Sequence, residues 1–175
     1  MAQYSIDTTH SEISFTVRHM MFAKVRGQFT TWNANLAYDA ADPAKSKVEV
    51  TIDTASINTR EAQRDGHLRS DDFFSAEKFP KMTFKSTRIE GAKGQYKLTG
   101  DLTIRDVTRE VTLDVEQTGA GKDPWGNDRL GFSAKGTILR SEFGLKWNQA
   151  LEAGGVLVSD KVEIEVEAQV VSKAG

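Results

Sequence analysis

The chain has 175 residues, a net charge of −2 and no cysteine, which excludes disulfides, thiolate nucleophiles and Cys-ligated zinc. Its 23 Lys and Arg are scattered among 25 Asp and Glu, whereas nucleic-acid binding needs a clustered basic face, so we expect no nucleic-acid partner. A chain of this length without linkers or repeats predicts one domain, residues 1–175.

The first residues, MAQYSIDTTHSEISF, lack the basic and then apolar pattern of a secretory signal peptide. No window approaches the roughly 18 apolar residues that a membrane-spanning helix needs. We therefore expect a soluble protein that is cytoplasmic as written, or periplasmic if a signal peptide has been removed.

The dominant pattern is an alternation of apolar and polar residues, which is typical of antiparallel strands with one dry and one wet face. The apolar sets are Ile13, Phe15 and Val17; Val48, Val50 and Ile52; Met82 and Phe84; Leu98, Leu102 and Ile104; Val111, Leu113 and Val115; Leu130, Phe132, Ala134 and Ile138; and Val162, Ile164, Val166, Ala168 and Val170.

One stretch changes the phase of this alternation. The inward positions Val25, Gly27 and Phe29 are odd-numbered, whereas Trp32, Ala34, Leu36 and Tyr38 are even-numbered. A strand cannot move its apolar residues to the other face without an extra residue, so we predict a β-bulge near Thr30 and Thr31.

A single segment suggests a helix. In NTREAQRDGHL, Asn58 is placed to cap the helix and Glu61 follows three residues later, as in a capping box. Asp65 and Arg69 are spaced to pair on one face, and Gly66 keeps the helix short. The following RSDDFF is predicted to be a loop that turns back toward the strands.

Eight or more strands with one apolar face must stack as two sheets or close into a barrel. Their inward residues include large rings, among them Phe29 and Phe132. An eight-stranded barrel can be filled by side chains or can hold a small ligand. The alternation alone does not decide between a filled and a hollow interior.

The three histidines, His10, His19 and His67, have no close metal-ligand spacing to one another. His67 lies shortly before Asp71 and Asp72, so these three could share a metal ion or a proton. The alternative is that both aspartates are turn and cap residues that arrange the chain before the phenylalanines. We favour the alternative and predict no metal site.

Ser11 lies beside His10 and Asp7, but adjacent residues of an extended chain point to opposite faces, so they do not form a nucleophile and its base. The GAGK stretch from Gly119 to Lys122 lacks the spacing of a phosphate-binding loop and is predicted to be a hairpin loop. We expect neither catalytic residues nor a cofactor.

Four blocks of the sequence resemble the YceI-like, polyisoprenoid-binding family, in order and over nearly the whole chain. They are YSIDTTHSEISFTVRHMMFAKVRGQF, RDGHLRSDDFFSAEKFPKMTFKS, LTGDLTIRDVTREVTLDV and RSEFGLKW. The resemblance implies an extended, eight-stranded antiparallel lipocalin-like barrel with a short helix near one end. It also implies an apolar tunnel that holds a long-chain isoprenoid lipid of the quinone or polyprenyl type, and no catalysis. The Gly-x-Trp opening motif of true lipocalins is absent.

On this interpretation the dry faces of the strands form the tunnel wall, and the segment from Asn58 to Phe74 is a lid whose two phenylalanines cover or enter the interior. His19 continues the inward parity, and we favour a hydrogen bond from its ring to a backbone carbonyl over contact with a lipid head group. The predicted ligand-binding residues are Phe15, Val17, His19, Phe29, Phe73, Phe74, Phe84, Leu102 and Phe132.

Two further partners are expected. Loading and unloading of a long lipid predict transient membrane contact. The strongly alternating KVEIEVEAQVV stretch near the carboxyl end predicts an edge strand through which a homodimer could form. The other functions that the sequence leaves open are an enzyme acting on an isoprenoid chain inside the barrel and a structural barrel with a filled core.

Overall fold

The computed structural model describes residues 2–149, 151 and 157–172. Within these residues it contains eleven β-strands and one α-helix, α1, of residues Ala62–Arg69. The strands are β1 (Ala2–Ile6), β2 (Glu12–His19), β3 (Ala23–Phe29), β4 (Trp32–Tyr38), β5 (Lys47–Asp53), β6 (Ile57–Asn58), β7 (Lys81–Ala92), β8 (Gln95–Ile104), β9 (Val107–Lys122), β10 (Asp128–Leu139) and β11 (Lys161–Ser172).

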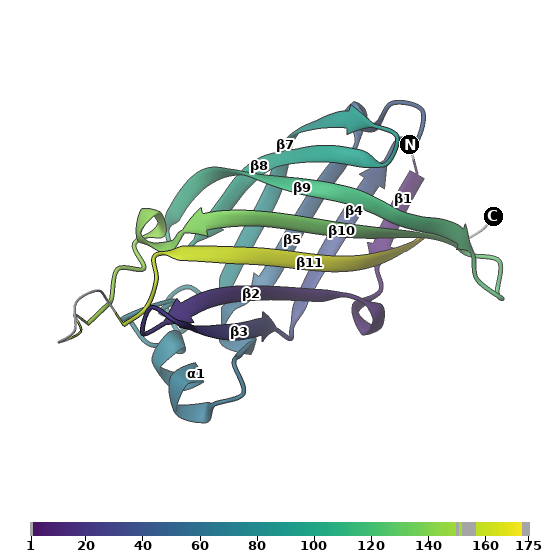
Figure 1. The fold of residues 1–175 in the computed structure, drawn as a ribbon. Helices are drawn as coiled ribbons and strands as arrows, with labels where there is room; N and C mark the ends of the chain where they lie inside the picture. The colour runs from purple at the N-terminus through teal and green to yellow at the C-terminus, as the bar shows by residue number, and fades with distance from the viewer. Residues whose placement is uncertain (1, 150, 152–156, 173–175) are drawn as a thin grey trace.

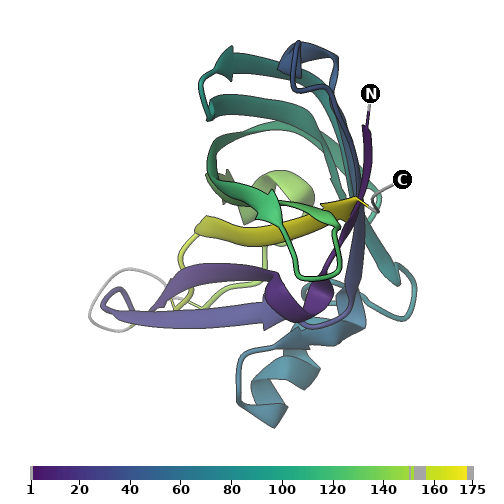
Figure 2. The ribbon, with the colours of Figure 1, turned by 90° about the vertical axis from the view of Figure 1, so that its right-hand side faces the viewer.

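The sheet closes on itself. Eight strands follow one another in the order β1-β4-β5-β7-β8-β9-β10-β11, and β11 pairs again with β1. All pairings are antiparallel, and the closed wall is visible end-on in Figure 2. Figure 1 shows α1 beneath one end of this barrel, beside β2 and β3. The predicted all-β, eight-stranded antiparallel barrel with a short helix near one end is confirmed.

The phase change at Thr30 and Thr31 marks a bend between two strands and not a bulge within one. Before the bend, β3 pairs with β2 and β6; after it, β4 pairs with β1 and β5. The Thr31 carbonyl accepts a hydrogen bond from Asp53 N at 2.9 Å, which fixes the bend against the end of β5. Since the pairing partners change at this point, the inward-pointing residues can change there from odd-numbered to even-numbered positions.

Glycines make room for large rings in the barrel wall. Gly27 lies directly opposite Phe15, and a Cβ atom at Gly27 would overlap the Phe15 ring. A Cβ atom at Gly100 would overlap the Phe84 ring in the same way. This pairing of the smallest residue with a large ring is how a narrow barrel accommodates aromatic side chains.

The helix α1 starts later than the sequence predicts. Its N-cap is Glu61, whose carboxylate accepts hydrogen bonds from the backbone N–H groups of Gln63 and Arg64. Asn58 belongs to β6, and its side chain accepts from Arg60 N instead, so the prediction that it caps the helix is wrong. A carboxylate at the N-terminus also interacts favourably with the helix dipole. Within the described part of the chain, no helix has both the length and the apolar character needed to cross a membrane.

Polar side chains hold α1 against the barrel. Buried Asp65 accepts from Thr59 N at 2.9 Å and from Thr59 Oγ1 at 2.6 Å. Arg69 donates to the carbonyl oxygens of Ala55 and Ile57. The predicted Asp65–Arg69 pair is therefore wrong, because each side chain finds a stronger set of partners on the segment that precedes the helix.

The GAGK stretch is part of a strand. Strand β9 continues to Lys122 and pairs with β10 as far as Asp128, so the turn is made by residues 123–127. The prediction of a hairpin loop at Gly119–Lys122 is wrong in its boundaries, because cross-strand pairing extends through the glycines.

Strand β11 is not an edge. It pairs with β10 along its full length on one side, and with β2 and then β1 on the other. The prediction that this strand offers a dimerisation edge is wrong, because barrel closure has already used both rows of its backbone hydrogen-bonding groups.

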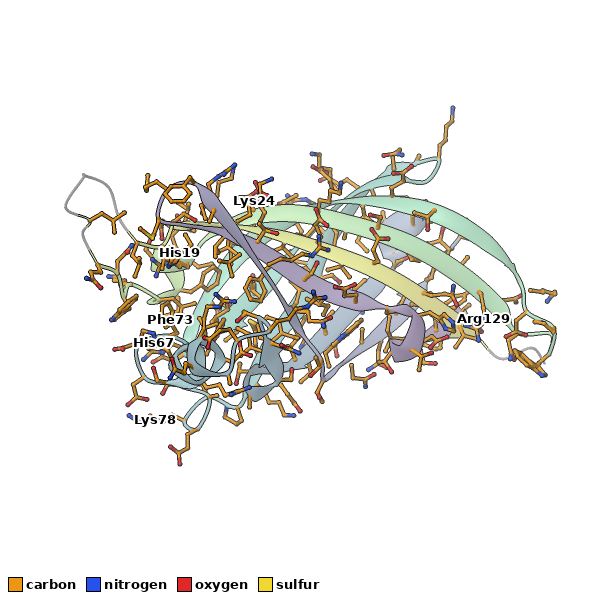
Figure 3. All side chains as sticks on the ribbon, turned by 60° about the horizontal axis from the view of Figure 1, so that its bottom comes forward. His19, Lys24, His67, Phe73, Lys78 and Arg129 are labelled. Atoms are coloured by element: carbon orange, nitrogen blue, oxygen red, sulfur yellow. The ribbon has the colours of Figure 1, made fainter. Side chains whose placement is uncertain are left out.

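An ion-pair network ties together the barrel end opposite α1, where Figure 3 places Arg129. Arg129 Nη1 donates to Asp7 Oδ2 and to Gln169 Oε1, both at 2.8 Å, and Nε donates to Asp123 Oδ2 at 3.0 Å. Hydrogen bonds from Thr9 and Arg129 hold the pKa of Asp7 well below its usual range. Burial alone would raise the pKa of Asp123, but hydrogen bonds from the backbone of Asn127 and from Arg129 lower it to about 2.

Replacing Asp123 with Asn should lower the thermal stability near neutral pH, and the deficit should shrink in acid. The folded-state pKa of Asp123 is about 2, below the unfolded value of about 3.9. Its stabilising contribution is therefore complete above about pH 4 and is lost as the pH falls toward 2. Melting curves of wild type and variant at several pH values test this; a deficit that stays constant down to pH 2 would contradict it.

Candidate functional site

The barrel encloses an elongated cavity of about 600 Å³. Every second residue of β11 from Val162 to Val170 lines it. At about 3.3 Å per residue these eight steps correspond to roughly 26 Å along the strand. The cavity is therefore a tunnel along the barrel and not a pocket at one end.

The tunnel wall is almost entirely apolar along its middle, and polar groups gather toward its ends. Aliphatic and aromatic side chains from each of the strands β1 to β11 contribute to the wall. The polar lining residues at the α1 end are His19, Thr59, Gln63, Arg64, His67 and Arg140, and those toward the opposite end include Asn35, Tyr38, Ser46 and Tyr96.

The structure brings all nine predicted ligand-binding residues to this one cavity. They come from separate strands and from the turn after α1, yet each contributes to the lining. These residues are Phe15, Val17, His19, Phe29, Phe73, Phe74, Phe84, Leu102 and Phe132. Their contact with a ligand stays a prediction.

An aromatic cluster lies at the α1 end of the tunnel. The Phe73 ring is 5.1 Å from His67 and 5.5 Å from Trp147, and the last two rings are 4.6 Å apart, all between centroids. Phe74 packs edge-on against Phe29 at 5.8 Å. Figure 3 shows His67, Phe73 and His19 at this same end. Phe73 is only 5% exposed, so it is part of both the core and the tunnel wall.

His67 pairs with one of its two aspartates. Its Nε2 lies 2.8 Å from Asp72 Oδ2. Asp71 instead accepts from Ser75 Oγ at 2.6 Å and lies near Lys78, and both neighbours lower the pKa of Asp71, Ser75 most. The three side chains thus do not converge, and the described residues contain no group of three or more His, Cys, Asp and Glu placed to hold a metal.

Ser11 and His10 have different partners. Ser11 Oγ accepts from Gln169 N at 2.9 Å, whereas His10 Nδ1 lies 2.7 Å from Asp7 Oδ2. Asp7 is at the same time held by Arg129. This geometry makes Ser11 a backbone-pairing residue and not a nucleophile.

Arg140 is a lining residue that the sequence-based assignment missed. It is 5% exposed, and burial lowers the pKa of its guanidinium. The guanidinium carbon lies 5.8 Å from the centre of the Phe73 ring. The alternation of the sequence could have placed it in the tunnel wall, because position 140 continues the even-numbered inward face of β10. The guanidinium donates to the carbonyl oxygens of Leu145, Trp147, Val158 and Ser159 at 2.7–3.2 Å.

Arg140 therefore joins two segments that follow β10 and precede β11 and fixes them at the tunnel end. Trp147 is positioned by this contact, and it too was missed, although it stands in the RSEFGLKW block. The sequence feature that could have identified Trp147 is that it is a tryptophan outside any alternating stretch.

His19 lines the tunnel, as its parity predicts, and its backbone bridges to Val158. No described residue forms a hydrogen bond with its ring, so the expected backbone carbonyl is not found among them and stays a prediction. The half-buried ring is turned toward the cavity, where Val17 and Val25 lie on the same face. It is thus a polar group at the tunnel end that can donate or accept a hydrogen bond.

Aromatic rings also gather toward the opposite end. Tyr38 lies edge-on to Tyr4 at 6.3 Å and to Phe132 at 6.1 Å between ring centroids. Burial, and then the neighbouring Tyr96, raise the pKa of Tyr38 to about 12. The Tyr38 hydroxyl is therefore neutral at physiological pH.

Comparison with known proteins agrees with this architecture. The YceI-like domain matches residues 4–170. A UPF0312 protein of Staphylococcus epidermidis is 39% identical over 170 residues, which cover 97% of each chain. BcnA of Burkholderia cenocepacia superposes with a TM-score of 0.82 at 26% identity, over 96% of this chain and 99% of that one.

A polyisoprenoid-binding domain from Saccharophagus degradans superposes with a TM-score of 0.70 over 99% of this chain and 100% of that one. At 15% identity this likeness establishes the shared fold. The domain match over nearly the whole chain and the 39% identity to a full-length relative establish the family. The chain belongs to the YceI-like family.

Proposed function

We propose that this protein binds a long-chain isoprenoid lipid, of the quinone or polyprenyl type, for transport, storage or sequestration. The observation that carries the proposal is the tunnel of about 600 Å³, apolar along its middle and polar toward its ends. The polyisoprenoid-binding domain of the same fold supports the ligand class. A filled core, which the sequence left open, does not fit a cavity of this volume.

The wall favours a tail without polar groups. Each buried methylene contributes about 0.8 kcal/mol, whereas a polar group left without a partner in an apolar interior costs about 1–3 kcal/mol or more. A tail along the tunnel would pass Val162, Val166 and Val170 on one side. The head group would then lie among polar residues at the α1 end, near His19 and Arg64.

Titration with polyprenols and quinones of increasing tail length tests this proposal. Affinity should rise with each isoprene unit until the tail fills the tunnel, and then level off because ordering costs offset further burial. A straight-chain fatty alcohol of equal length is the matched comparison. Affinity that is independent of tail length would contradict the proposal, and equal affinity for the fatty alcohol would contradict the isoprenoid preference.

Replacing His19 with Gln should weaken binding of a quinone about tenfold, or about 1.4 kcal/mol. The ring makes no hydrogen bond to a described residue and faces the tunnel, so a head group can use it. His10→Gln is the control, because His10 is exposed and lies outside the tunnel lining. Unchanged quinone affinity in His19→Gln, measured by fluorescence titration, would exclude head-group recognition by this residue.

A further inference from the structure

The turn between β2 and β3 exposes large apolar side chains. Met20, Met21 and Phe22 are 41%, 56% and 73% exposed. Met20 and Met21 also have left-handed backbone conformations, with φ of 54° and 69°. Such φ values are unfavourable for residues other than glycine and occur where the surrounding structure enforces them. The fold thus presents three apolar side chains to solvent in a turn where small polar residues are usual.

Two cations flank these side chains. Arg18 and Lys24 are exposed and lie directly opposite each other in the β2–β3 pairing. Neither forms an ion pair with any carboxylate in the described part of the chain. Like charges directly opposite in a sheet are destabilising, and an external anionic surface would relieve that repulsion. We call residues 18–24 the hairpin tip.

The hairpin tip lies beside the α1 end of the tunnel. His19, which lines the tunnel, is the residue between Arg18 and Met20. Met20 N donates to the carbonyl of Leu157, another lining residue, at 2.7 Å. Figure 3 shows Lys24 and His19 at the end that also holds Phe73. Any surface that contacts the hairpin tip is therefore brought close to the polar end of the tunnel.

We propose that the hairpin tip docks the protein on an anionic lipid surface. Met20, Met21 and Phe22 would enter the boundary between head groups and acyl chains, and Arg18 and Lys24 would lie at the level of the phosphates. This combination of an apolar wedge with basic neighbours is how monotopic elements bind membranes. This inference rests on the proposed function. It adds the place at which a lipid would enter and leave the tunnel.

A second exposed ring offers a matched control. Trp125 is 79% exposed on the turn between β9 and β10, at the barrel end opposite α1. There Lys122 is already paired with Asp128 at 2.8 Å, and Asp123 lies two residues before the ring. This turn combines apolar exposure with paired charges and an acidic neighbour, so it lacks the charge complementarity of the hairpin tip.

The test is sedimentation of the purified full chain with phosphatidylcholine vesicles and with phosphatidylcholine–phosphatidylglycerol vesicles. Wild type should bind the anionic vesicles and lose affinity in high salt. The double variant Met21→Ser/Phe22→Ser should bind at least tenfold more weakly, Arg18→Gln/Lys24→Gln should lose the preference for phosphatidylglycerol, and Trp125→Ser should bind like wild type. All substituted side chains are exposed, and melting curves verify the fold.

A second measurement follows the tip directly. A Phe22→Trp variant should show a blue-shifted emission on addition of anionic vesicles that exceeds any shift of wild type. Absence of this shift, or loss of binding in Trp125→Ser but not in Met21→Ser/Phe22→Ser, overturns the proposal. The proposal is also overturned if the protein does not bind vesicles but self-associates with increasing concentration, and Phe22→Ser abolishes that self-association. The hairpin tip would then contact a second copy of the chain.

These outcomes are independent of the isoprenoid ligand. If the wild type and the tip variants bind polyprenol in the titration above but the wild type does not bind vesicles, the docking proposal alone is overturned. Vesicle binding by a protein that shows no dependence on tail length overturns the proposed ligand and leaves the docking surface in place.

Discussion

Replacing Ala134 with Phe is expected to reduce binding of a long-chain polyprenol by far more than tenfold and to leave the barrel folded. Ala134 lies midway along β10, and its cross-strand neighbours Val115 and Val166 also line the tunnel. A ring at this point projects into the cavity and blocks passage of a tail. Because the cavity offers space, the added ring should cost no more than the roughly 1–3 kcal/mol typical of overpacking.

Lys135→Phe is the control for this experiment. Lys135 is the next residue of β10, so its side chain points to the opposite face of the sheet, where it is exposed. The control adds the same ring to the same strand without entering the tunnel, and polyprenol affinity should stay at the wild-type level. Equal affinities of the two variants, with unchanged melting curves, would mean that the tail does not occupy the tunnel at this depth.

Truncating Phe73 and Phe74 to Ala is expected to accelerate release of a bound tail more than it slows association. Phe73 lies in the tunnel wall between His67 and Trp147, and Phe74 packs on Phe29. Affinity changes among variants of one complex fall mostly on the off-rate. Removing a buried phenylalanine side chain also costs about 3–5 kcal/mol of stability, so melting curves must accompany the kinetics. Stopped-flow transfer of a fluorescent polyprenyl probe to vesicles measures the off-rate.

Phe143→Ala separates the gating role from the packing role. Phe143 is 1% exposed in the core but does not line the tunnel. It should lose comparable stability with an unchanged off-rate at temperatures where it remains folded. If the Phe73→Ala/Phe74→Ala variant also shows the wild-type off-rate beside a large drop in Tm, the two rings only hold the fold together, and the lid hypothesis is wrong.

The strands could be predicted from the sequence, because an alternation of period two is a local property of the chain. The closure could not, since it depends on the pairing of Ser5 and Ile6 with Val171 and Val170, more than 160 residues away. The same long-range contact explains the error about β11, which has the alternation of an edge strand but is paired on both sides. The family resemblance, and not the alternation, supplied the barrel.

The predicted first residue of the helix was wrong for a local reason. Asn58 has the better capping chemistry by residue type, but it is used in β6, so the next available acceptor, Glu61, caps the helix. Conversely, the parity of His19 was enough to place it in the tunnel, because side-chain direction follows strand position. Arg140 continues the inward, even-numbered face of β10, but a charged residue is not expected in an apolar wall.

The polar end of the tunnel is assembled from segments that are distant in the sequence. Arg140 reaches the carbonyls of Trp147 and Val158, and His19 bridges to Val158, so the arrangement depends on contacts that no local pattern records. The apolar wall, by contrast, is a sum of independent strand faces. Sequence reasoning therefore found the wall residues and His19, but it missed Arg140 and Trp147 at the polar end.

Mass spectrometry of organic extracts from the purified protein is the most direct test of whether the tunnel holds a long-chain isoprenoid lipid. Wild type and Lys135→Phe should each yield a long-chain isoprenoid lipid in near-stoichiometric amount, and Ala134→Phe should yield almost none. Chemical conversion of that lipid on incubation with the protein would point to an enzyme instead. An extract without lipid from a wild-type protein that also takes up no polyprenyl probe would contradict the account.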